Sequence, residues 1–168
     1  MSDQEVSQEI AKYAQGIGIG VLAYVRADFT PVQRTFGAFA VSGNDILLAT
    51  GRSSAKVSEI AIHPNASFFL ENRDQKIEEW KSALYFGKLA IVTGKEELRQ
   101  AVEAIGSRSA FFKNAAQGDG LKNYLVLRLQ TREIEWLDYA KGRGHIDKLV
   151  IETEASISGG SNTIHGHE

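Results

Sequence analysis

Residues 17–25 alternate between two sets of side chains with a period of two, and this alternation constrains the fold more than any other feature of the sequence. A β-strand places successive side chains on opposite faces. One face would carry Ile17, Ile19, Val21, Ala23 and Val25, and the other would carry Gly18, Gly20, Leu22 and Tyr24. Glycines inside a strand indicate that something large lies close against it. The segment is therefore predicted to be a strand packed against a bulky group.

Two further strands are expected at short intervals after this one. Residues 27–31 contain Asp28 and Pro31 and predict a turn, and a second strand is expected over about Val32–Val41. The turn Ser42–Asp45 then leads into a third strand, Ile46–Thr50. Strands joined by short turns are typical of an antiparallel meander.

The rest of the chain mixes strands with short helices. Strands are expected over about 66–71, 82–93 and 124–139, and residues 149–151 would add a short edge strand. The spacing of apolar residues predicts helices over about 3–15 and 53–62, a helix after Gly94 whose apolar stripe runs from Leu98 to Ile105, and a short helix around 108–114. About six strands and a few short helices lack the alternation of a parallel doubly wound sheet. Long strands with tight turns instead favour an antiparallel barrel, which removes exposed sheet edges.

Length, charge and composition exclude several classes of protein. One domain is expected at residues 1–155 with a polar tail at 156–168, since 168 residues suffice for one core. The lack of cysteine excludes a disulfide framework, a thiolate nucleophile, a cysteine-ligated zinc and an iron–sulfur cluster. A net charge of −2 argues against broad nucleic-acid binding. The apolar runs are too short for a membrane helix, and the acidic start is unlike a signal peptide, so a cytoplasmic location is expected.

The segment from Ala49 to Lys56 carries the clearest chemical signal. It lies where a strand passes into a helix, and a helix start offers unpaired backbone N–H groups and the positive end of the helix dipole. Cations should avoid this place, yet Arg52 and Lys56 both occur there beside three hydroxyl side chains, those of Thr50, Ser53 and Ser54. Positive charge and donors gathered at a helix start predict an anion site, most simply for a phosphate.

A simpler interpretation gives this segment no ligand. Ser53 or Ser54 would only cap the helix, and the two cations would be solvated. Arg34 favours the phosphate, because it lies in the middle of an expected strand among apolar neighbours. A lone arginine in a strand usually extends outward to water, but three cations converging from two strands and a helix are less ordinary.

These segments together resemble the pyridoxamine 5′-phosphate oxidase-like family of FMN-binding split β-barrels. The similarity runs from about Gly16 to Arg108 and is best between Arg34 and Ala66. It rests on the order and spacing of short motifs, namely Gly20–Val25, the turn with Pro31, Arg34–Gly37, Ile46–Gly51, Arg52–Lys56, His63–Ser67 and Trp80–Ala90. The resemblance implies a mainly β fold, a six-stranded antiparallel split β-barrel with a few flanking helices. It also implies a homodimer with FMN at each of two sites between the subunits.

The resemblance further assigns residues of this chain to the cofactor. Contacts with the flavin ring and the ribityl chain correspond to Arg34, Thr35, Phe36, Gly37, Ala49 and Thr50. The phosphate-binding lysine corresponds to Lys56, with Arg52, Ser53 and Ser54 nearby. A polar strand residue of the family corresponds to Ser82, and Trp136 would be a late aromatic residue near the cofactor.

Departures from the motif separate the chain from the family's genuine oxidases. Those oxidases place an arginine directly before the lysine, where this chain has Ala55, and Ser82 stands where glutamine is frequent. A C-terminal Arg-x-His substrate motif is also missing. The helix after Trp80–Ala90 resembles the flavin reductase-like and nitroimidazole-resistance-like branches. The expected function is therefore an FMN-dependent oxidoreductase that passes electrons from a reduced nicotinamide to a small acceptor.

Other functions stay open at this point. The same fold could hold haem, for which only His63, His145 and the tail residues His165 and His167 offer a ready axial ligand, or carry flavin as a sensor or carrier without turnover. A deazaflavin-dependent reductase would use the basic loop Lys141–His145, which could also be a lid over the cofactor or a plain surface loop. A dimeric scaffold would bind no cofactor.

Overall fold

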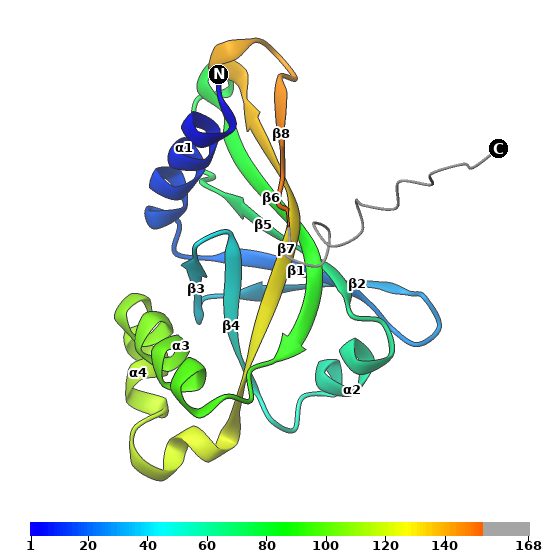
Figure 1. Ribbon diagram of the computed structural model, residues 1–168, viewed down its shortest axis with the longest axis vertical. Coiled ribbons are helices and arrows are strands. Elements are labelled where there is room, and N and C mark those ends of the chain that lie inside the picture. The colour runs from blue at the N-terminus through cyan, green and yellow to red at the C-terminus, as the bar shows by residue number, and fades with distance from the viewer. Residues whose placement is uncertain (153–168) are drawn as a thin grey trace, which may run out of the picture.

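Eight strands form one antiparallel sheet in residues 1–152, the part of the chain that the computed structural model describes (Figure 1). They are β1 (Gly20–Val25), β2 (Pro31–Phe36), β3 (Phe39–Ser42), β4 (Asp45–Gly51), β5 (Asn65–Glu71), β6 (Lys81–Ile91), β7 (Tyr124–Asp138) and β8 (Ile146–Val150). The order in the sheet is β2-β1-β5-β6-β7-β4-β3, and β8 pairs with β7. The tail expected at 156–168 lies outside the described residues.

The long strand β7 is the one around which the sheet divides. It pairs with β6 over residues 127–138, almost its whole length. Its first part, residues 124–129, pairs on the other side with β4, whereas residues 133–137 pair with β8. One strand therefore belongs to two diverging parts of the sheet, which splits the barrel.

The sheet curls toward a barrel because two strands that follow each other in the chain lie at its opposite ends. β2 pairs with β1, and β3 pairs with β4. Only Gly37 and Ala38 join β2 to β3, so the two ends of the sheet lie side by side. The backbone N–H of Ala49 donates to the carbonyl of Ala38 at 3.0 Å, which fixes this link against β4.

The sequence predicted six strands, and two differences account for the eight. The strand expected over 32–41 is two strands, because the chain crosses from one end of the sheet to the other at Gly37 and Ala38. The edge strand expected at 149–151 is β8, which begins earlier, at Ile146. The fold class, a mainly β antiparallel split barrel with a few flanking helices, is confirmed.

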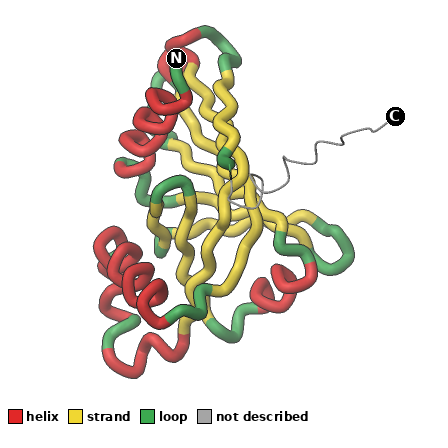
Figure 2. The backbone as a smooth tube through the Cα atoms, in the orientation of Figure 1, coloured by secondary structure: helices red, strands yellow, loops and turns green. Residues whose placement is uncertain are grey.

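The helices lie around the outside of the strands, as Figure 2 shows. They are α1 (Asp3–Gln15), α2 (Ala55–Ile62), α3 (Lys95–Arg108) and α4 (Ala110–Ala115), with single 3₁₀ segments η1 (Ile77–Glu79), η2 (Gly118–Asn123) and η3 (Tyr139–Lys141). α1 has the predicted bounds, and Ser2 and Glu5 form a capping box at its start. No helix of the described residues is long and apolar enough to cross a membrane.

The larger of two buried clusters lies inside the barrel and includes the apolar stripe of α1. Its large members include Leu22, Phe39, Phe68, Tyr85 and Trp136. A Cβ atom at Gly20 would overlap the ring of Phe68, so the bulky group predicted beside the first strand is confirmed there. Gly18 has open space instead.

The smaller cluster packs α3 and α4 on the opposite face of β3, β4 and β7. Its members are Ala40, Leu47, Ala49, Val92, Ala101, Ile105, Phe112 and Val126. Residues of β4 thus alternate between the two clusters, with both faces of the strand covered. This packing fixes α4 beside the end of β4.

Gly87 is expected to be the glycine of the sheet least tolerant of a side chain. A Cβ atom there would overlap the backbone carbonyl of Gln130, at the place where the pairing of β6 with β7 shifts register. Because a backbone strand cannot move aside as a side chain can, Gly87→Ala should lower the free energy of unfolding by about 1–3 kcal/mol. Urea denaturation measures the loss, with Gly18→Ala as the control that meets no atom within 4 Å. Equal stability of the two variants would contradict this account.

Candidate functional site

The amine of Lys56 lies where β4 passes into α2, and it is bound by two hydroxyl groups. Its Nζ donates to Thr50 Oγ1 at 3.0 Å and to Ser54 Oγ at 2.7 Å. Ser54 holds the backbone position before the helix, but its side chain makes no capping hydrogen bond. The hydroxyl that a simple cap would use is therefore turned to the lysine.

The surroundings of Lys56 disfavour its charge. Burial lowers the pKa of Lys56 first, repulsion by Arg34 lowers it further, and the attraction of Glu59 partly opposes both. The Phe36 ring, whose centre lies 5.6 Å from the amine, offers the charge only a weak cation–π attraction. Within residues 1–152 no carboxylate comes within 4.0 Å of this amine, so its two close partners are neutral. A bound anion would supply the missing negative charge.

Arg34 reaches the same place from β2. By strand alternation it shares a face with Val32 and Phe36, which are buried, yet Arg34 itself is exposed. Its guanidinium makes one hydrogen bond, from Nη1 to the carbonyl of Gln33 at 2.9 Å, and no ion pair within the described residues. Most of its five donors are therefore free to bind a ligand.

A groove of about 410 Å³ runs from this pair of cations to α4. We call it the Lys56 groove, and it is lined by Arg34, Thr35, Phe36, Gly37, Ala38, Ala49, Thr50, Gly51, Lys56, Ser109, Phe111, Phe112 and Tyr124. The structure thus brings together seven of the residues expected at the cofactor, namely Arg34, Thr35, Phe36, Gly37, Ala49, Thr50 and Lys56. They come from β2, β4 and α2, and the link between β2 and β3 holds them in one place.

The remaining expected residues lie differently. Arg52 turns away from Lys56 and donates to the carbonyls of Lys122 at 2.9 Å and Tyr124 at 3.2 Å, so it fastens the start of β7. Ser53 is exposed beside the groove and does not line it. Ser82 is buried at the far end of β6, opposite Leu137, and lies outside the groove of its own chain.

One wall of the groove was not foreseen from the sequence. Ser109, Phe111 and Phe112 come from the start of α4, and Tyr124 begins β7. These residues lie more than fifty positions after Lys56, and no local pattern links the two segments. The adjacent Phe111 and Phe112 were a signal, because a short surface helix can bury only one of two neighbouring side chains.

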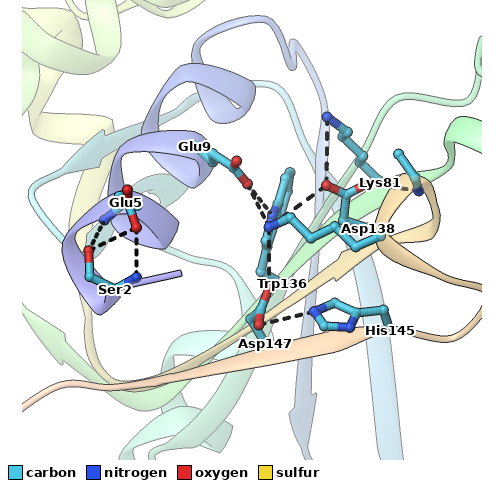
Figure 3. Close-up of polar contacts among 10 residues, drawn as sticks. Ser2, Glu5, Glu9, Lys81, Trp136, Asp138, His145 and Asp147 are labelled. Atoms are coloured by element: carbon cyan, nitrogen blue, oxygen red, sulfur yellow. Dashed lines mark hydrogen bonds and ion pairs between the residues drawn. The ribbon is translucent and has the colours of Figure 1, made fainter.

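Trp136 lies near the end of β7 opposite Tyr124, roughly 40 Å from it along the strand at 3.3 Å per residue. The basic loop 141–145 follows that end of the strand. Trp136 is 1% exposed and donates to Glu9 at 3.1 Å, so it belongs to the core. Figure 3 shows this corner, where His145 also lies 3.1 Å from Asp147. Lys141 is held there by carboxylates of Glu9 and Asp147. The loop is a paired surface loop in this chain and does not cover the Lys56 groove.

A second hollow, of about 500 Å³, lies on the outer face of β1 and β5. We call it the outer trough, and its lining is Gly16, Ile17, Gly18, Ile19, Val21, Thr35, Phe69, Glu71, Asn72 and Arg73. Its walls are largely apolar, and the side chain of Ile19 is 64% exposed. Thr35 lines both hollows, so the trough adjoins the Lys56 groove.

One comparison with known proteins identifies a family. The sequence model of the pyridoxamine 5′-phosphate oxidase family matches residues 6–138. Among curated proteins, none matches the sequence. Solved structures of the same fold include a haem-binding protein from Mycobacterium smegmatis, with 18% identity and a TM-score of 0.72 over 89% of this chain and 58% of that one. This chain therefore spans little more than half the length of that protein.

Two further structures cover most of both chains. A NimC/NimA family protein from Clostridium acetobutylicum is 16% identical, with a TM-score of 0.65 over 88% of this chain and 93% of that one. HutZ, the haem storage protein from Vibrio cholerae, is 17% identical, with a TM-score of 0.60 over 74% of this chain and 88% of that one. At these identities the likeness concerns the fold alone.

Lys56→Met should separate the effect of the lysine charge on stability from its role in binding phosphate. Methionine keeps the apolar stem and removes a charge that burial and Arg34 disfavour, so the unligated variant should be at least as stable as the wild type. Inorganic phosphate should raise the melting temperature of the wild type but not that of the variant. In the wild type this rise should shrink as the pH increases through the lowered pKa of Lys56, since only the charged amine attracts phosphate. Thermal unfolding across pH measures both, and an equal phosphate effect in the two proteins would remove Lys56 from the site.

Proposed function

The chain belongs to the pyridoxamine 5′-phosphate oxidase family, and from that premise we propose that it binds FMN in the Lys56 groove and acts as an oxidoreductase. It would pass electrons from a reduced nicotinamide to a small acceptor. The observation that carries the proposal is the meeting of Lys56 and Arg34 at one groove, with no carboxylate of residues 1–152 within 4.0 Å of the lysine amine. A phosphate monoester, with about −1.5 to −2 charges at neutral pH, matches two such cations.

The groove also has the size and lining that a flavin needs. Ligand sites usually measure about 300–1,000 Å³, and this groove measures about 410 Å³. Thr50 and Ser54 already hold the lysine amine in place, so it would meet a phosphate without rearrangement. The small residues Gly37, Ala38 and Ala49 leave room for a flat ring beside them.

The flavin would supply the hydride chemistry, which leaves positioning and electrostatics to the protein. Lys56 would hold the phosphate and Arg34 would face the negative charge of the ligand. The backbone and small side chains of β2 and β4 would keep the ring in a fixed orientation. This division of work would require no pair of acid and base side chains among the described residues that line the groove.

A second copy of the chain is the proposed partner, with FMN at the interface. The outer trough supports this, because its apolar walls include the exposed Ile19 and because Thr35 joins it to the Lys56 groove. Covering the trough would therefore bring a second subunit to the edge of the cofactor. It would also remove an apolar surface that a lone subunit leaves in water.

Haem is the second candidate, since two proteins of the same fold are haem-binding. Haem needs an axial ligand. Of the described histidines, His63 lies 3.3 Å from the carbonyl of Ala27 and His145 is paired with Asp147, and neither lines the Lys56 groove or the outer trough. His165 and His167 lie outside the described residues. The groove therefore favours FMN, and a Soret band in the purified protein would favour haem.

The decisive test is cofactor retention. Protein incubated with FMN and passed through gel filtration should keep about one FMN per chain, read from its flavin absorbance. Lys56→Ala should raise the Kd for FMN roughly 10- to 150-fold, equivalent to about 1.5–3 kcal/mol for a charged hydrogen bond. Riboflavin, which lacks the phosphate, should bind both proteins equally.

The control for that experiment is Lys88→Ala, which removes an exposed lysine of β6 outside the groove. Wild-type protein that passes FMN through unbound would overturn the proposal. Oxidation of NADH or NADPH by the loaded protein then distinguishes an enzyme from a flavin sensor or carrier, and parallel titration with a deazaflavin distinguishes the two cofactors.

Ile19→Lys should disrupt the proposed dimer. The substitution places a charge in the outer trough, and a twofold interface would bury that charge twice. We expect light scattering at micromolar concentration to give the mass of two chains for the wild type and of one for Ile19→Lys, with weaker FMN retention in the variant. Ile91→Lys is the matched control, because Ile91 is also an exposed isoleucine but lies outside the trough. A dimeric Ile19→Lys would place the interface elsewhere.

A further inference from the structure

Phe111 is exposed in a way that the fold does not explain. Its side chain is 77% exposed, more than that of any other large apolar residue in residues 1–152. It also lines the Lys56 groove, together with Ser109 and Tyr124. An aromatic ring left in water at the wall of a groove is available to a ligand.

The neighbouring residues show why Phe111 is the ring left over. Phe112 takes the buried position of α4, is 1% exposed, and packs edge-on against Tyr124 with ring centres 5.4 Å apart. Successive residues of a helix lie about 100° apart. Phe111 therefore turns away from the cluster that holds Phe112, and its ring faces remain free.

The backbone under Phe111 is nevertheless held firmly. The backbone N–H of Phe112 donates to Ser109 Oγ at 3.2 Å, and that of Ser109 donates to the carbonyl of Ile105 at 2.9 Å. The preceding Arg108 donates to the carbonyl of Ile17 at 2.6 Å and lies 4.7 Å from the centre of the Phe39 ring. The exposed ring thus stands on a fixed base, which lowers the entropy lost when it meets a ligand.

The other residues of the groove indicate which part of a ligand the Phe111 ring would meet. The proposed phosphate site lies at Lys56. Other residues that line the groove are small or polar: Gly37, Ala38, Ala49, Thr50 and Gly51. The aromatic wall offers an exposed ring to a large flat group that lies beside these small residues. We propose that Phe111 stacks on the isoalloxazine ring and so makes the groove selective for flavins, an inference that rests on the proposed function.

Riboflavin separates this role from phosphate binding. Phe111→Ala should raise the Kd for FMN and for riboflavin by the same factor, about 2- to 12-fold for the loss of one aromatic pair. Lys56→Ala should affect FMN alone. Phe29→Ala is the matched control, because Phe29 is 70% exposed but lies outside the groove; it should leave both constants unchanged.

A spectroscopic readout excludes a merely structural role for Phe111. Tryptophan in contact with a flavin quenches its fluorescence, so Phe111→Trp should shorten the fluorescence lifetime of bound FMN. Phe29→Trp should leave that lifetime at the wild-type value. Both variants replace exposed side chains, so folding is expected to be unaffected, and their circular dichroism should match that of the wild type.

The possible results separate this inference from the proposed function. If the wild type retains FMN but Phe111→Ala binds both flavins normally, or Phe111→Trp has the lifetime of Phe29→Trp, only the inference is overturned. A loss confined to FMN would place Phe111 near the phosphate and would also overturn it. If the wild type retains neither FMN nor riboflavin, both proposals fall.

Discussion

The two-residue link between β2 and β3 is the constraint on which the rest of the structure depends. It places the two ends of one antiparallel sheet side by side, and the hydrogen bond from Ala49 to Ala38 fixes it against β4. Arg34 of β2 therefore meets Thr50 of β4 and Lys56 of α2, although they lie in separate parts of the chain. Without this link β2 and β3 would be distant edge strands, and the Lys56 groove would lack the side formed by β2.

The electrostatics of the groove follow from that closure. Two cations are held close together, and burial adds to the cost of the charge on Lys56. A folded protein usually pairs such charges with carboxylates, as this one does at Lys141. Within residues 1–152, the cations at one end of β7 have carboxylate partners, whereas Lys56 and Arg34 at the other have none within 4.0 Å, and this contrast supports the ligand site proposed there. It also explains why the basic loop 141–145 is a part of the scaffold.

Residues of the site that are close together in the sequence could be predicted, whereas contacts with distant segments could not. Lys56, Thr50 and Ser54 lie within seven residues, so a local pattern identified them, and Arg34 stood out as a charge among apolar strand residues. Arg52 belonged to the same local pattern, yet the carbonyls of Lys122 and Tyr124 hold it elsewhere. Those partners are seventy residues away, and a competing long-range hydrogen bond leaves no trace in the local sequence. The wall made by α4 was missed for the same reason.

The sequence by itself determined the fold class and most of the helices and strands, because periodicity, turns and caps are properties of neighbouring residues. The bounds of α1, the long strand β7 and the cluster of Thr50, Ser54 and Lys56 all belong to that category. Only the tertiary structure decided that residues 32–41 form two strands, that Phe111 faces the groove while Phe112 is buried, and that Arg52 serves the scaffold. These outcomes depend on which distant segments pack together, and that choice is made by closure of the sheet and burial of the core.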